Sequence, residues 1–287
     1  MLPPSFLSCY HLNMSKLNDV KIFFCFPNST IKTKGIFVDA LIRDVQPNRK
    51  VGYAGYLKKV YLHKHLSGYF NSKNINTYRP LLAGNKNKIE KIIQLAAQKC
   101  LEQLPLSSLF VFIFPWLGEK YDTAFGGVNG FAPYASTVHL FISLTRFSSQ
   151  SLKETLAHEF SHAVFFYYHK SALKLTLLET LVFEGLAENF REEVVGEKPS
   201  SWSTALNKKQ CVSALLSLKQ SLYSRKYDLY HDVFFGSKKY KRWTGYSIGY
   251  KIIKSFRETY PEKSWKEVMK MKPETIFAMS PFTKKEV

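Results

Sequence analysis

Two histidines, His158 and His162, stand four residues apart with Glu159 directly after the first, in the pattern H-E-x-x-H. On an α-helix a step of four residues turns through about 400°, which brings both imidazoles to one face, about 6 Å apart along the axis. Two imidazoles placed in this way can hold one metal ion. Glu159 is rotated by only about 100° from His158, so its carboxylate can reach a metal-bound water as a general base. The pattern predicts a hydrolytic zinc site.

The surrounding residues predict that this motif lies on a buried helix. Ser151 and Glu154 form an S-x-x-E capping box, which would start a helix about two turns before His158. Apolar residues flank the motif at Leu152, Leu156, Ala163, Val164 and Phe166. Because burying imidazoles and a carboxylate is costly unless something pairs them, this setting favours metal binding.

A zinc site needs a third protein ligand, and two nearby candidates fail. A metzincin would have glycine at 165 and histidine at 168, where this chain has Phe165 and Tyr168. His169 lies about 10 Å beyond His162 along the same helix face, too far to join the metal unless the helix breaks. We expect His169 to be a surface or helix-end cation.

The third candidate is Glu184, in a largely apolar helix predicted over residues 177–190. Glu188 lies four residues on and shares its face, whereas Glu179 points about 140° away. Glu184 is therefore predicted as the third ligand, with Glu188 orienting a ligand histidine through its other ring nitrogen. Gly185 weakens the helix by roughly 1 kcal/mol against alanine, which suggests close approach of a neighbouring helix backbone.

These residues carry a resemblance. His158-Glu159-x-x-His162 followed by E-G-L-A-E at residues 184–188 resembles the gluzincins, the clan of thermolysin and the zinc aminopeptidases. With Gly245-Tyr246-x-x-Gly249-Tyr250 and the K-P-E-T-I-F segment at 272–277, the chain more closely resembles the YjaZ-type family of predicted zinc-dependent proteases. The resemblance covers roughly residues 85–287 and implies Zn²⁺ as cofactor and a peptide or protein as substrate.

The resemblance also implies a tyrosine on a late helix that stabilises the oxyanion, as in the zinc aminopeptidases. Tyr246 and Tyr250 share one helix face. Tyr246 is the first choice, Tyr250 the second and His231 the third. Packing against the second helix is the alternative explanation for both tyrosines.

Length and apolar content indicate a globular chain with an α+β architecture. Its 287 residues are 45% hydrophobic, and the longest apolar run, residues 109–117, is too short to span a membrane. Residues 1–13 contain no lysine or arginine, so they lack the charged region of a signal peptide. We therefore expect a cytoplasmic protein without a membrane span.

Strands are predicted over residues 21–26, 35–42, 109–114 and 136–143, and helices over residues 85–104, 208–230 and 245–260. The strand at 109–114 is continuously apolar and should be central. By the resemblance to gluzincins, the strand at 136–143 should be the sheet edge that binds extended substrate. The residues before this strand are expected either to line the substrate cleft or to form a plain turn: Gly126, Gly127, Asn129 and Gly130. His139 is predicted to be a strand residue and not a ligand.

The expected organisation is a tail over residues 1–19, an α/β sub-domain over 20–150 carrying the substrate-edge strand, and a helical zinc-binding sub-domain over 151–287. This is a gluzincin-like arrangement, with a mixed sheet and helices packed on a mostly helical C-terminal half. The zinc would lie at the junction.

The four cysteines are widely scattered, without C-x-x-C, and are expected to be buried or inert thiols: Cys9, Cys25, Cys100 and Cys211. The net charge of +19 admits nucleic acid, anionic lipid or an acidic substrate as partner. The one dense basic cluster, residues 238–243, is predicted to be a solvated loop without specific nucleic-acid function.

The sequence favours a zinc-dependent peptidase that uses metal-activated water, with Glu159 as general base. Two alternatives stay open. One is a zinc-binding interaction module without turnover, and the other is a basic, nucleic-acid-associated protein.

Overall fold

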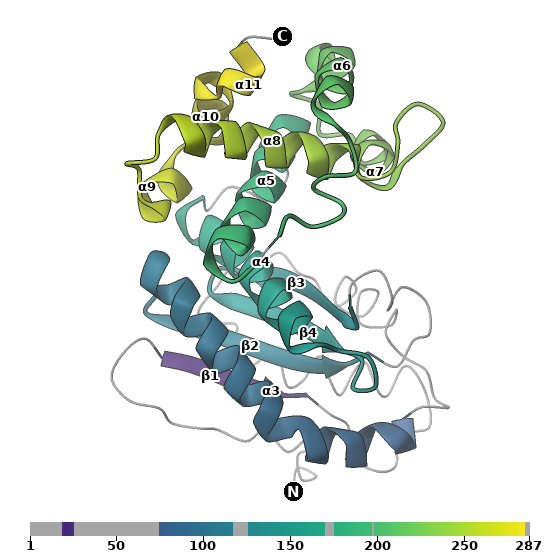
Figure 1. Ribbon diagram of the computed structural model, residues 1–287, viewed down its shortest axis with the longest axis vertical. Coiled ribbons are helices and arrows are strands. Elements are labelled where there is room, and N and C mark those ends of the chain that lie inside the picture. Colours follow the sequence, from purple (N-terminus) through teal and green to yellow (C-terminus); the bar gives the residue numbers. More distant parts are fainter. Residues whose placement is uncertain (1–18, 26–74, 117–125, 170–174, 197, 285–287) are drawn as a thin grey trace, which may run out of the picture. The chain divides into compact units, whose positions relative to one another are not determined.

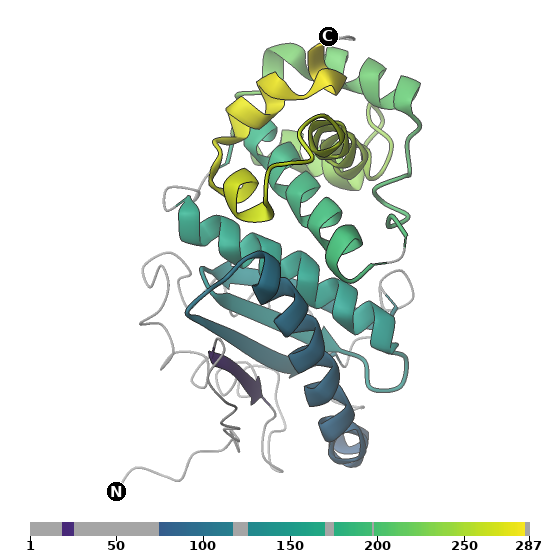
Figure 2. The ribbon, with the colours of Figure 1, turned by 60° about the vertical axis from the view of Figure 1, so that its left-hand side comes forward.

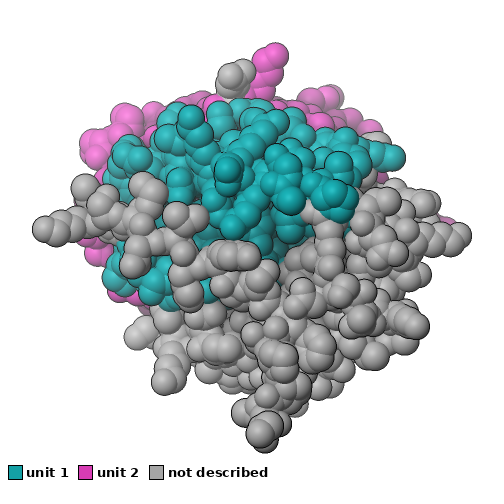
Figure 3. Space-filling model, turned by 90° about the horizontal axis from the view of Figure 1, so that it is seen from below, with its two compact units in different colours: residues 1–163 teal, residues 164–287 magenta. Residues whose placement is uncertain are grey.

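The computed structural model describes residues 19–25, 75–116, 126–169, 175–196 and 198–284 (Figure 1). It comprises two compact units, residues 1–163 and 164–287, coloured separately in Figure 3. The strand predicted over 35–42, Cys9 and nearly all of the predicted tail lie outside the described residues. The sub-domain boundary predicted at residue 150 stays a prediction.

The first unit contains a four-stranded sheet. Its strands are β1 (Asp19–Phe24), β2 (Ser108–Pro115), β3 (Val128–Tyr134) and β4 (Thr137–Ile142). They lie in the order β1-β2-β4-β3, with β1, β2 and β4 parallel and β3 antiparallel to β4. The predicted mixed sheet is confirmed. β2 is central and buried from Leu109 to Pro115, because its apolar side chains are covered on both faces.

The predicted edge strand is wrong. Within the predicted range 136–143, Thr137–Ile142 form β4, which pairs with β2 on one side and β3 on the other. The edge of the described sheet is β3, in a segment that the sequence indicated to be turn-like. Gly130 and Pro133 have low strand propensity and hide the alternation, although proline without its N–H is tolerated at a sheet edge.

Two helices, α3 (Ile75–Gln103) and α4 (Ser149–Tyr168), lie on the same face of this sheet (Figures 1 and 2). The predicted apolar spacing of α3 is confirmed, since Ile89, Ile93, Ala97 and Cys100 are fully buried. The helix begins ten residues before the predicted start, because Pro80 and Gly84 weaken the sequence pattern of its first turns without ending it.

The helix that carries H-E-x-x-H is confirmed, but its predicted cap is wrong. α4 begins at Ser149, and its first turn is held by a reciprocal pair one turn before the predicted capping box. The Ser151 backbone N–H donates to Ser148 Oγ (2.9 Å), and the Ser148 N–H donates to Ser151 Oγ (3.1 Å). Ser151 is therefore inside the helix, at the position that Glu or Gln occupies in a capping box.

The second unit is helical, as predicted. After α5 (Leu177–Val194) come α6 (Lys208–Leu218), the 3₁₀ helix η3 (Lys219–Ser221), α7 (Tyr227–Phe235), α8 (Thr244–Thr259), α9 (Trp265–Lys270), α10 (Pro273–Met279) and α11 (Pro281–Lys284). The single helix predicted over 208–230 is wrong. The helix is interrupted between α6 and α7. In this segment the carbonyls of Leu222 and Ser224 accept the backbone N–H groups of Leu178 and Leu177 at the start of α5.

The predicted close helix approach at Gly185 is confirmed. A Cβ atom on Gly185 would collide with the backbone carbonyl of Gly249 in α8. The interior of the second unit is thus built on two helices whose backbones touch.

The three described cysteines are buried free thiols, and burial raises the pKa of Cys211 to about 11. The four cations of the basic cluster are exposed between α7 and α8: Lys238, Lys239, Lys241 and Arg242. Within the described part of the chain, no helix combines the length and the apolar character needed to cross a membrane.

Candidate metal centre

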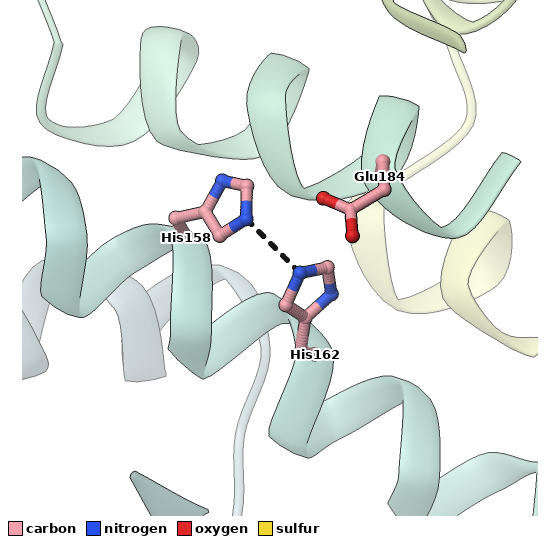
Figure 4. A group of neighbouring side chains, drawn as sticks. All are labelled: His158, His162 and Glu184. Atoms are coloured by element: carbon pink, nitrogen blue, oxygen red, sulfur yellow. Dashed lines mark hydrogen bonds between the residues drawn. The ribbon is translucent and has the colours of Figure 1, made fainter. Parts of the chain in front are cut away.

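The two motif histidines face each other on α4. Their Nε2 atoms lie 3.0 Å apart and their ring centroids 4.6 Å apart (Figure 4). His162 is 6% exposed and His158 is half-buried. The four-residue spacing therefore brings both imidazoles to one point, as the sequence predicts.

Glu184 on α5 completes a group of three. A nitrogen from each histidine and a carboxylate oxygen of Glu184 all lie within 4.8 Å of one another (Figure 4). Glu184 is 8% exposed. Among the described residues, no other group of three or more His, Cys, Asp or Glu side chains lies close enough together to hold a metal ion.

The donor set fits zinc. Two imidazole nitrogens and one carboxylate oxygen are the ligands of catalytic zinc sites that keep a fourth position open. Two nitrogens that are each 2.0–2.1 Å from one tetrahedral zinc lie about 3.3 Å apart. The 3.0 Å between the two Nε2 atoms is close to this separation. A zinc ion would therefore be held by His158, His162 and Glu184.

Glu159 lies against the edge strand of the sheet. It is 8% exposed, and its side chain fits over Gly130 of β3, where an added Cβ would collide with Glu159 Cγ and lie 2.8 Å from Oε1. The candidate general base thus lies next to the candidate ligands on α4 and beside the backbone of β3.

Glu179 caps the helix that carries Glu184. Its carboxylate accepts the Thr176 backbone N–H at 2.6 Å, while the Glu179 N–H donates to Thr176 Oγ1 at 3.2 Å. This is a capping box, and the sequence pattern T-x-x-E at residues 176–179 could have identified it. The cap accounts for Glu179 and fixes where α5 begins.

Glu188 is fully buried and holds the segment that follows α5. Its carboxylate accepts hydrogen bonds from Ser200 Oγ (2.6 Å), Ser203 Oγ (2.7 Å) and Trp202 Nε1 (2.8 Å), and Arg191 Nε lies 3.4 Å away. Sequence reasoning did not find these partners, since they come 12 to 15 residues later. The predicted role of Glu188 in orienting a ligand histidine stays a prediction.

The tyrosine candidates have different surroundings. The Tyr250 hydroxyl donates to Glu192 Oε2 at 2.7 Å. Burial, together with the Glu192 carboxylate, raises the pKa of Tyr250. Glu192 is eight residues beyond Glu184, about 12 Å along α5. Tyr246 is half-buried, with its ring edge-on to Phe234 at 5.0 Å. His231 is exposed on α7.

The other described histidines lie outside the three-residue group. His139 is fully buried in β4, edge-on to Phe112 and Phe114, as expected of a strand residue. His169 follows α4, stacks on Phe165 at 4.2 Å and contacts the Met269 carbonyl through Nε2 at 2.9 Å. It is half-buried, so the expected surface position is only partly correct.

Comparison with known proteins gives a family. The uncharacterised protein YjfC of Bacillus subtilis is 27% identical over 152 residues, which are 48% of this chain and 48% of that protein. The chain thus spans about half the length of this curated relative. No solved structure matches the chain. The model of a family described as predicted Zn-dependent proteases (DUF2268) matches residues 89–278, which include both motif histidines, Glu159 and Glu184. With two thirds of its length matched, the chain belongs to this family of predicted Zn-dependent proteases.

Proposed function

We propose that the protein is a zinc-dependent peptidase of gluzincin type. The observation that carries the proposal is the meeting of His158, His162 and Glu184 within 4.8 Å, with Glu159 adjacent to His158 on α4. Two histidines and a glutamate leave one zinc position open for water or substrate, as hydrolysis requires. The family description and the E-G-L-A-E segment support the same function, and so does the resemblance to the YjaZ-type family.

Glu159 is the proposed general base. When bound, zinc lowers the pKa of a water towards about 7 and polarises the scissile carbonyl. The Glu159 carboxylate accepts a proton from the attacking water while the water oxygen bonds to the carbonyl carbon. The same carboxylate then gives this proton to the amine that leaves when the C–N bond breaks. Burial of Glu159 favours this exchange by excluding competing water.

The proposed substrate is an extended peptide that pairs with the side of β3 that faces away from β4. The Ser143 N–H donates to the Gly127 carbonyl (2.8 Å), and the ladder continues with Val128 opposite Ile142 and Gly130 opposite Leu140. Since hydrogen-bonded pairs alternate along an antiparallel ladder, the polar groups of Gly130 point away from β4. A peptide could meet them there by β-augmentation.

Tyr246 is the proposed donor to the developing oxyanion. The Tyr250 hydroxyl is engaged with Glu192, two turns beyond Glu184, which favours Tyr246 over Tyr250. We further propose that the substrate is a peptide or protein, that no specific nucleic acid is bound, and that the protein is cytoplasmic.

Hydrolysis of casein or of a peptide library by the purified protein tests the proposal. Cleavage should stop with a chelator, return with Zn²⁺ and be absent in Glu159→Gln. Cleavage that survives chelation, or that persists in Glu159→Gln, would come from another enzyme or another mechanism. A zinc-loaded chain that cleaves nothing would instead favour an interaction module.

A further inference from the structure

Gly130 gives Glu159 the space that its side chain occupies. A Cβ atom at this position would collide with Glu159 Cγ and lie 2.8 Å from both Glu159 Oε1 and Thr155 Cγ2. Ordinary contact between such atoms is about 3.5–4.0 Å. Glu159 and Thr155 stand four residues apart on α4, so this helix rests on β3 at the one residue without a side chain.

Backbone conformation does not explain the glycine. Positive φ angles, which favour glycine, occur nearby at Gly126 (60°) and Gly127 (76°) but not at Gly130. The requirement at Gly130 is therefore for space. That space is taken mainly by the side chain of the proposed general base.

The backbone of Gly130 also belongs to β3, the outer strand of the sheet among the described residues. Its N–H donates to Asn129 Oδ1 at 2.9 Å and not to β4, in agreement with the alternation of the ladder. The Ile142 carbonyl, opposite Val128, accepts the N–H of Trp116, the residue that follows β2, and therefore faces away from β3, which gives the same alternation independently. Glu159 thus rests on a residue whose peptide groups face the position where an extended peptide would add.

We propose that Gly130 is a positioning residue for Glu159. The missing side chain sets the distance between the base and the strand edge, so that the carboxylate lies beside a peptide paired with that edge. This inference rests on the proposed peptidase function. It adds that residue 130 must lack a side chain for catalysis, whereas holding the metal does not require this.

The kinetic test is Gly130→Ala. Zinc content and KM should stay near those of the parent, while kcat should fall by about ten- to a hundredfold, since a misplacement of about 1 Å has an effect of this size. Gly84→Ala is the matched control, because a Cβ there meets nothing within 4 Å and should leave kcat unchanged. Unchanged kcat in Gly130→Ala would overturn the proposal, as would a loss of zinc that accounts for the whole effect.

A second variant distinguishes displacement of Glu159 from crowding against Thr155. Gly130→Ala with Thr155→Ser removes the methyl group that the new Cβ would meet but leaves the contact with Glu159. Activity should stay low. Recovery to the parent's kcat would show that crowding against Thr155, and not displacement of Glu159, caused the loss.

A crystal structure of Gly130→Ala gives a readout that is independent of turnover. The Glu159 carboxylate should move away from β3 while His158 and His162 stay in place. An unmoved Glu159 would contradict the proposal. If the parent protein cleaves nothing, the proposed function fails, and the position of Glu159 in this crystal structure still decides the present inference.

Discussion

A side chain on Gly185 would collide with the backbone carbonyl of Gly249, with its Cβ 2.5 Å from the carbonyl carbon and 2.8 Å from Ile253 Cγ1. In the reverse direction, a Cβ on Gly249 would collide with the Leu181 carbonyl oxygen. Neither contact can be relieved by rotating a side chain alone, because both involve helix backbone. The two glycines thereby fix the helix that carries Glu184 against the helix that carries Tyr246.

Gly185→Ala should destabilise the protein by about 1–3 kcal/mol or more, since overpacking outweighs the gain of roughly 1 kcal/mol in helix propensity. Chemical denaturation measures the free energy of unfolding. Gly84→Ala, at an exposed helix position with open space, should be neutral or slightly stabilising. Equal stability of the two variants would mean that the helices are not in close contact at Gly185.

Glu188→Ala should cost about 3–5 kcal/mol of stability, because it leaves two hydroxyls, an indole N–H and Arg191 around a removed buried acceptor. Glu193→Ala is the control. Its carboxylate pairs with Arg257 but is half exposed, so the loss should be at most about 1 kcal/mol. If Glu188 also orients a ligand histidine, zinc affinity falls by about ten- to a hundredfold. Unchanged affinity would restrict Glu188 to its structural role.

Glu184→Ala should change zinc binding, whereas Glu179→Ala should change only stability. Loss of a ligand in Glu184→Ala should abolish tight zinc binding. Loss of the Glu179 carboxylate, which accepts the Thr176 backbone N–H, should cost about 1 kcal/mol of stability and leave zinc in place. Zinc titration against a competing chelator, together with thermal denaturation, distinguishes the two. Tight binding in Glu184→Ala combined with loss in Glu179→Ala would reverse the ligand assignment.

Tyr246→Phe should lower kcat by roughly ten- to a thousandfold with little change in zinc content or KM, because only the oxyanion loses a donor. Tyr250→Phe removes the hydrogen bond to Glu192 and should cost about 1 kcal/mol of stability without a comparable effect on kcat. Steady-state kinetics on one peptide substrate compares the two. The opposite ranking would transfer the role to Tyr250, and normal kcat in both would leave His231 as the remaining candidate.

Local patterns predicted the features that depend on local spacing. The histidine pair needs only the helical repeat, and the buried strand β2 needs only its continuous apolar run. Gly185 predicted a close helix contact because few other requirements place glycine in the middle of an apolar helix.

Features that depend on distant partners were missed. β3 is a strand because it pairs with β4, and Gly130 and Pro133 carry no strand pattern of their own. The break after α6 depends on carbonyls that bond to the start of α5, more than 40 residues earlier. The hydrogen bonds of Glu188 likewise come from residues 200–203, which spacing along one helix cannot show.

Metal analysis of the purified protein by mass spectrometry, on the parent, Glu159→Gln and His162→Ala, tests the zinc centre most directly. Glu159→Gln keeps the three ligands and should hold about one zinc per chain, as the parent does, while losing nearly all turnover. His162→Ala should hold little zinc, because two ligands bind far more weakly than three. A parent that binds no zinc when it is supplied, or a His162→Ala variant that keeps a full equivalent, would contradict the metal centre formed by His158, His162 and Glu184.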